Sequence, residues 1–156
     1  MGVSGVGKTT IGEALAERLG WRFLDADDLH SPESVAKMAA GTALEDADRW
    51  PWLYRLNREL WALEARNENA VLACSALKER YRRRLTDGLA DYEVVFLHGP
   101  PELIRARLEK RRHRYMTASL LQSQFAALEP PERAIAVDVA APPEECVARV
   151  ISLLDR

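Results

Sequence analysis

The segment that most constrains this chain lies at its beginning. The pattern G-x-x-x-x-G-K-[ST] is matched at every fixed position by Gly2-Val3-Ser4-Gly5-Val6-Gly7-Lys8-Thr9. Its glycines allow successive backbone N–H groups to curl around phosphate oxygens, and a helix that follows points its positive end at the same anion. Apolar residues recur with helical spacing at Ile11, Leu15 and Leu19. These features predict a phosphate-binding loop (P-loop) for a nucleoside triphosphate, and they disfavour the alternative of a glycine-rich turn at a frayed terminus.

The motif also predicts individual roles. Lys8 is expected to reach the β- and γ-phosphates, and the Thr9 hydroxyl is expected to bind Mg²⁺. The residues predicted to contact the nucleotide from this loop are Gly2, Ser4, Gly5, Val6, Gly7, Lys8, Thr9 and Thr10.

A P-loop normally follows a buried strand, whereas only Met1 precedes Gly2 in this sequence. Each buried apolar side chain of such a strand contributes about 1.5–3 kcal/mol, and the stability of a whole domain is only about 5–15 kcal/mol. We therefore expect Met1 to be an internal residue of a longer chain whose first strand is missing here.

Short apolar runs alternate with helical stretches along the rest of the chain. Strands are predicted at 21–25, 70–74, 94–97 and 135–139, and the 70–74 run is apolar throughout, as parallel strands covered on both faces tend to be. A polar turn is predicted at 45–49, before a long helix. The expectation is one α/β domain over 1–156: a P-loop NTPase fold with three layers, α/β/α, and a parallel sheet.

Composition excludes several classes of function. The net charge is -2, which is unlike a polyanion-binding protein, and no run of about 18 apolar residues suggests a membrane span. Cys74 and Cys146 fit no metal or redox spacing, so we expect reduced thiols in a cytoplasmic protein.

Several carboxylates follow the first predicted strand, in Asp25-Ala26-Asp27-Asp28-Leu29-His30. Ligands of open α/β sheets bind at the carboxyl ends of strands. A hydroxyl that accepts a phosphoryl group needs a nearby base, and Mg²⁺ takes oxygen ligands. A solvated acidic turn that caps a helix at Ser31 explains the same spacing equally well.

At this point the chain resembles a known family. The blocks that carry the resemblance are the P-loop, Asp25–His30, Lys37-Met38-Ala39-Ala40-Gly41, Leu44-Glu45-Asp46-Ala47-Asp48-Arg49-Trp50-Pro51-Trp52-Leu53, Cys74-Ser75-Ala76-Leu77-Lys78-Glu79-Arg80-Tyr81-Arg82 and Leu120-Leu121-Gln122-Ser123-Gln124-Phe125. Together they resemble gluconokinases of the small P-loop type, which are related to shikimate kinase and the nucleoside monophosphate kinases. The likeness covers nearly the whole chain, and the D-x-D-R-x-P-W-L and C-S-A-L-K-x-x-Y-R blocks are specific to gluconokinases.

The resemblance implies transfer of a phosphoryl group from ATP to D-gluconate with Mg²⁺, by an enzyme that could form a homodimer. It makes Lys8, Asp27 and Arg111 catalytic, with Asp27 as the base or orienter of the acceptor hydroxyl. It assigns Mg²⁺ to Thr9 and Asp25. The acceptor-binding segment is about 27–66, and the implied acceptor contacts are Asp27, His30, Arg49, Ser75, Lys78 and Arg82.

Alternatives remain for several of these side chains. Arg49 suits a carboxylate, because a guanidinium binds it through two parallel hydrogen bonds. It could instead be a surface arginine paired with Asp46 or Asp48, an interaction worth about 0–1 kcal/mol. His30 and Lys78 could equally be structural or surface groups.

The resemblance also places a lid over ATP at about 111–119, with Arg107 and Arg111 near the nucleotide. The segment around Pro142 is expected to flank the adenine. The chain departs from the family here, because His113-Arg114 replaces the usual Gly-His.

Three other readings stay open. The same fold could phosphorylate shikimate, a nucleotide or another polyol acid. Arginines at 82–84 and 111–114 could bind nucleic acid, although the net negative charge disfavours this. Finally, this chain could be inactive without its first strand.

Overall fold

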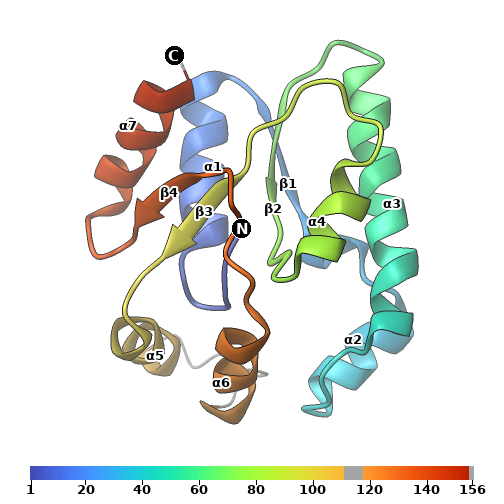
Figure 1. Ribbon diagram of the computed structural model, residues 1–156, viewed down its shortest axis with the longest axis vertical. Coiled ribbons are helices and arrows are strands. Elements are labelled where there is room, and N and C mark those ends of the chain that lie inside the picture. The colour runs from blue at the N-terminus through green and yellow to red at the C-terminus, as the bar shows by residue number, and fades with distance from the viewer. Residues whose placement is uncertain (111–117, 155–156) are drawn as a thin grey trace.

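The computed structural model describes residues 1–110 and 118–154 of the chain (Figure 1). In chain order its elements are α1 (Lys8–Leu19), β1 (Arg22–Asp25), the 3₁₀ turn η1 (Ala26–Leu29), α2 (Pro32–Ala39), α3 (Asp46–Glu64), β2 (Ala70–Ala73), α4 (Glu79–Thr86), β3 (Val95–His98), α5 (Pro101–Lys110), α6 (Ala118–Ala127), β4 (Ile135–Asp138) and α7 (Pro143–Leu154). The predicted α/β class is confirmed, and all four predicted strands are found within a residue or two of their expected bounds.

The strands pair in parallel, as predicted, but they form two pairs instead of one continuous sheet. β1 pairs with β2, with Arg22 opposite Ala70, and β3 pairs with β4, with Val95 opposite Ile135. In α/β folds such strands are buried between helices and therefore read as continuous apolar runs.

Met1 lies between the two pairs, at the chain end that Figure 1 marks N. The Met1 amino group donates to the Val95 carbonyl at 2.6 Å, and the Leu97 N–H donates to the Met1 carbonyl at 3.0 Å. On the other side, the Gly2 N–H donates to the Ser75 carbonyl at 3.2 Å. Met1 and Gly2 thus make strand-like hydrogen bonds in the position where the sequence analysis expects a strand before the P-loop.

Helices lie on both sides of the strands (Figure 1). α1 packs against α7 and against β1 and β2, while α3 packs against α4 on the other side. Two apolar clusters fill the interior. The first includes Val6, Ile104 and Val150, and the second is centred on Leu53 and Leu56 of α3.

The polar segment 45–49 differs from its prediction as a turn, because α3 already begins at Asp46. The Asp48 carboxylate accepts the Glu45 N–H at 2.9 Å, which satisfies a donor that the first turn would otherwise leave unpaired. Lys37 of α2 contacts the same carboxylate at 2.7 Å and fixes it from outside. Across the described part of the chain, no helix is long and apolar enough to span a bilayer.

Candidate active site

The P-loop is fixed by close packing of its glycines. Gly5 has a φ of +80°, and a Cβ added there would lie 2.5 Å from the Leu108 side chain of α5. Gly7 has a φ of +103° and is the residue before α1. Both conformations are strained for any residue with a side chain, so the loop geometry depends on glycine here. Because Gly7 directly precedes α1, the positive end of this helix adjoins the loop.

Lys8 follows at the start of α1, with its ammonium group directed back to the loop. Its Nζ donates to the Val3 carbonyl at 3.0 Å. Burial lowers the pKa of Lys8 from its ordinary value, and the nearby carboxylates of Asp27 and Asp25 act in the opposite direction. The structure thus brings the predicted phosphate-binding lysine close to both predicted acidic residues.

Thr9 and Asp25 meet at the end of β1. The Thr9 hydroxyl donates to Asp25 Oδ2 at 3.1 Å, and Asp25 Oδ1 accepts the Asp27 N–H at 3.0 Å. One carboxylate thereby joins the P-loop helix to the η1 turn. A hydroxyl, a carboxylate and phosphate oxygens are the donor set that Mg²⁺ takes at nucleotide sites, so these residues fit the implied ion. The described residues contain no protein-only cluster of three or more metal-binding side chains.

Asp27 and His30 lie on the same 3₁₀ turn but in different environments. The Asp27 side chain is 85% exposed, whereas the His30 side chain is only 4% exposed. His30 Nε2 lies 3.6 Å from Asp27 Oδ1, and the ring stacks on Trp52 at 4.3 Å between centroids. Within residues 1–110 and 118–154, the buried His30 Nδ1 has no hydrogen-bond partner. The Asp27 carboxylate is thus open to solvent, whereas the His30 ring is packed against Trp52.

A group of cations surrounds the ring of Tyr81 at the start of α4. Arg49, Lys78 and Arg80 each lie 5.5–5.7 Å from the ring centroid. Asp46 balances part of this charge through contacts with the Tyr81 hydroxyl and Arg80, and the hydrogen bond from Tyr81 holds the pKa of Asp46 below its ordinary value. The structure thus brings the predicted contacts Arg49 and Lys78 together.

The sequence analysis gave no substrate-binding role to Arg80 or to Tyr81, whose ring lies at the centre of the cation group. The one signal for them is their place in the C-S-A-L-K-x-x-Y-R block.

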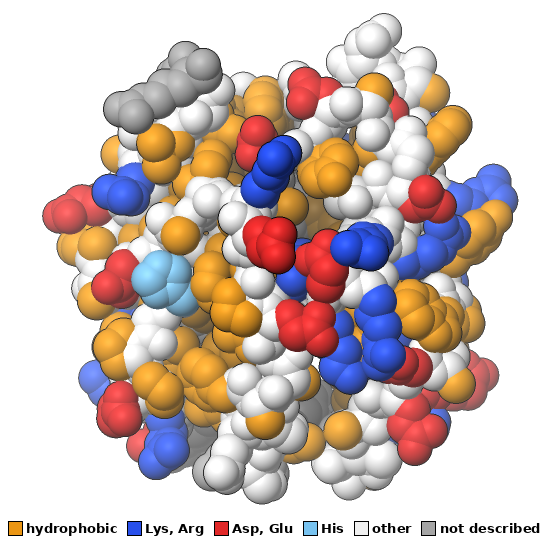
Figure 2. All heavy atoms as spheres, in the orientation of Figure 1, with side chains coloured by type: hydrophobic (Ala, Val, Ile, Leu, Met, Phe, Trp, Pro, Cys, Tyr) orange, Lys and Arg blue, Asp and Glu red, His pale blue; other side chains and the backbone are white. Residues whose placement is uncertain are grey.

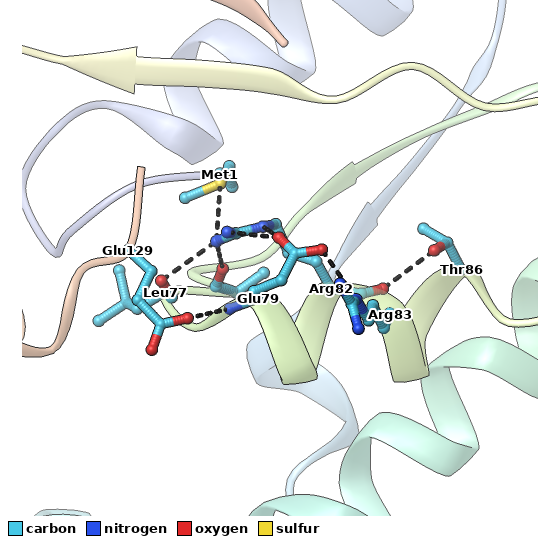
Figure 3. A network of polar contacts seen from close by, with 8 residues as sticks. Met1, Leu77, Glu79, Arg82, Arg83, Thr86 and Glu129 are labelled. Carbon is cyan, nitrogen blue, oxygen red and sulfur yellow. Dashed lines mark hydrogen bonds and ion pairs between the residues drawn. The ribbon is translucent and has the colours of Figure 1, made fainter. Parts of the chain in front are cut away.

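Arg82 does not join this group, although the resemblance makes it an acceptor contact. Its side chain is buried, and its guanidinium donates to the Ala76 and Leu77 carbonyls and to the Glu79 carboxylate (Figure 3). These bonds occupy the donors inside the protein, so we leave Arg82 out of the proposed site. Ser75 uses its carbonyl to accept the Gly2 N–H.

The predicted nucleotide side is described only in part. Arg107 of α5 donates to the Val139 carbonyl at 2.7 Å, just after β4. This bond joins the arginine to the segment expected to flank the adenine. Arg111 and most of the predicted lid at 111–119 lie outside the described residues.

Gln124 of α6 is a further site residue that the sequence analysis did not single out. Its Oε1 accepts the Ser4 N–H at 2.7 Å, and its Nε2 donates to the Ser4 hydroxyl at 3.2 Å. The contact joins residues 120 positions apart, so no local pattern could reveal it. The only signal was its place in the Leu120–Phe125 block.

Known proteins are similar to this chain in sequence and in fold. A family model described as shikimate kinase matches residues 4–149. A probable gluconokinase from Xenopus tropicalis is 45% identical, over 89% of this chain and 83% of its own length. The chain belongs to the gluconokinase family. The thermosensitive gluconokinase of Escherichia coli strain K12 is also 45% identical, over 85% of this chain and 71% of its own. A gluconokinase structure from Sinorhizobium meliloti 1021 superposes with a TM-score of 0.90 at 43% identity, covering 100% of this chain and 89% of its own.

For a member of the gluconokinase family, the geometry is chemically coherent. The loop and the start of α1 offer positive potential to a phosphate chain. The Thr9–Asp25 pair offers oxygen ligands at its edge, and an exposed carboxylate, Asp27, lies next to both. Such an arrangement suits transfer of a phosphoryl group to a small hydroxyl compound.

Proposed function

We propose that this chain phosphorylates D-gluconate with ATP and Mg²⁺, forming 6-phospho-D-gluconate and ADP. The observation that carries the proposal is the joining of the P-loop to the acidic turn through Thr9, Asp25 and Asp27. The gluconokinase names of its relatives support the choice of acceptor.

On the donor side, the P-loop amides and Lys8 would bind the β- and γ-phosphates of ATP. Thr9 and Asp25 would hold Mg²⁺, Asp25 through water, and the ion would supply charge neutralisation on the phosphate oxygens. Lys8 already has a lowered pKa through burial, and the approach of anionic phosphate favours its charged form.

On the acceptor side, Asp27 would accept a hydrogen bond from the 6-hydroxyl of gluconate. As that oxygen bonds to the γ-phosphorus, the bond between the γ-phosphorus and the leaving oxygen of ADP breaks, and the hydroxyl proton passes to Asp27. Arg49 and Lys78 would bind the carboxylate at the other end, because the cation group around Tyr81 carries more positive than negative charge.

A role in binding nucleic acid has weaker support. Figure 2 shows acidic and basic side chains side by side across the middle of this face, not a continuous basic surface. Several arginines of α4 are also paired with acids of the chain: Arg82 and Arg83 with Glu79, and Arg84 with Asp87. Such pairing leaves fewer charges for phosphate backbones.

An acceptor screen tests the proposal. Release of ADP would be measured with gluconate, shikimate, a nucleoside monophosphate and the neutral polyol glucitol. We expect turnover with gluconate alone, and none after Lys8→Ala. Arg49→Ala should raise the KM for gluconate far more than that for ATP, with Arg58→Ala, an exposed change on the same helix, as the control. Preference for another acceptor, or equal effects of Arg49→Ala on both KM values, would contradict the assignment.

A further inference from the structure

Gln124 makes a paired contact with the P-loop. Because one amide both accepts the Ser4 N–H and donates to the Ser4 hydroxyl, it fixes the backbone and the side chain of Ser4 together. On its other flank the loop packs at Gly5 against the Leu108 side chain, an apolar contact without directional preference. Gln124 therefore orients Ser4 through hydrogen bonds.

The same segment reaches the acceptor side five residues later. The Glu129 N–H donates to the Leu77 carbonyl at 2.9 Å, and the Glu129 carboxylate accepts the Glu79 N–H at 2.6 Å (Figure 3). Glu79 begins α4, so Glu129 provides an acceptor for an N–H that the first helical turn leaves unpaired. The loop 75–78, which we name the acceptor loop, carries the proposed contact Lys78 and ends where Glu129 binds.

One short stretch, 124–129, thus binds the P-loop at one end and the acceptor loop at the other. Transfer of a phosphoryl group depends on in-line alignment of donor and acceptor, and small displacements lower the rate strongly. We propose that Gln124 and Glu129 are positioning residues: Gln124 holds the P-loop, and Glu129 holds the acceptor loop, in the geometry that binds each substrate. This inference rests on the proposed kinase activity, and neither side chain is assigned a direct contact with the reacting atoms.

The first test is Gln124→Ala. Loss of both hydrogen bonds to Ser4 should raise the KM for Mg-ATP, and its calorimetric Kd, about tenfold, the scale of one or two hydrogen bonds. The KM for gluconate should stay unchanged. Gln122→Ala is the matched control, because Gln122 is exposed on the same helix two residues away.

The second test is Glu129→Ala, with Glu129→Gln as the conservative variant. Loss of the bond to the Glu79 N–H should raise the KM for gluconate about three- to tenfold, the range expected for a helix cap. The KM for ATP should not change. Glu129→Gln keeps an oxygen acceptor at this position, so it should restore most of the affinity for gluconate. The backbone bond to Leu77 remains in both variants, which favours correct folding.

The split between the two KM values decides the inference. A merely structural role would lower the thermal midpoint and raise both KM values together in each variant, and that outcome would overturn it. So would normal kinetics in Gln124→Ala. Failure of the proposed function is distinguishable, because the unmodified chain would then turn over no gluconate, whereas the Gln124 effect on Mg-ATP binding is measured by calorimetry without any acceptor.

Discussion

Asp27 and Asp28 are adjacent carboxylates of the η1 turn, and both are exposed, yet only Asp27 lies beside His30 and acts on the pKa of Lys8. We expect Asp27→Asn to lower kcat by about 10²–10⁴, the usual size of a general-base effect. Binding of Mg-ATP and gluconate should be largely retained, since the amide keeps the shape of the side chain. Coupled release of ADP measures the rate, and calorimetry measures binding.

Asp28→Asn is the matched control for this change, because it removes the same charge one residue further along the turn. Its kcat should stay close to that of the unmodified chain. Equal losses in the two variants would show that the turn contributes only general negative charge, and an unchanged rate in Asp27→Asn would remove its role as base or orienter.

At the scale of single residues, the sequence was informative where the chemistry is local. The P-loop pattern could predict that Lys8 and Thr9 begin a helix directly after the loop, because the loop and that helix are contiguous in sequence. The same reasoning could not find Gln124, whose partner is 120 residues away. It also could not see that Arg82 turns inward, since burial of an arginine depends on carbonyls that the acceptor loop presents only after folding.

At the scale of elements, α3 and α4 are held together by a polar contact inside an apolar interface. The buried Asn57 donates through Nδ2 to the Leu85 carbonyl at 2.9 Å and to the Asp87 carbonyl at 3.0 Å. These carbonyls lie at the end of α4, where the helix itself provides no N–H donors for its last carbonyl groups. Asn57→Ala should therefore lower the free energy of unfolding by about 1–3 kcal/mol, because buried acceptors lose their donor.

Urea unfolding of Asn57→Ala and of the exposed control Arg58→Ala measures this difference. The KM for ATP should not change in either variant, since the hydrogen bonds of Asn57 go to the end of α4. A loss in Asn57→Ala no larger than in the control would mean that water replaces the amide, and the contact would then add little to the packing of the two helices.

Element types were predictable because apolar periodicity reports which face is buried, whereas starts and ends depend on individual hydrogen bonds. Helix α2 starts as expected after Ser31, whose hydroxyl accepts the Ser34 N–H. The turn expected at 45–49 became the start of α3 through the bond between Asp48 and the Glu45 N–H. A hydrogen bond between a backbone N–H and a side chain three residues further on can stabilise either an isolated turn or the first turn of a helix. The sequence alone was therefore compatible with both.

At the scale of the whole molecule, the two pairs of strands meet at Met1. The stability of the interior beside Met1 depends on a buried thiol keeping its proton. Cys74 follows β2 in this region and is only 4% exposed. Burial raises the pKa of its thiol from 9.0 to about 11. Between these two values the unfolded chain loses the proton and the folded chain keeps it, so the unfolded state binds fewer protons and stability falls as pH rises.

The expected loss is about 2 kcal/mol of unfolding free energy by pH 11, relative to pH 8. Other groups also titrate in this range, and burial raises the pKa of Cys146 as well. The informative quantity is therefore the difference between the unmodified chain and Cys74→Ala at each pH, from urea unfolding. That difference should be constant below pH 9 and should then shift in favour of Cys74→Ala. A flat difference up to pH 11 would mean that the fold compensates the charge of the Cys74 thiolate.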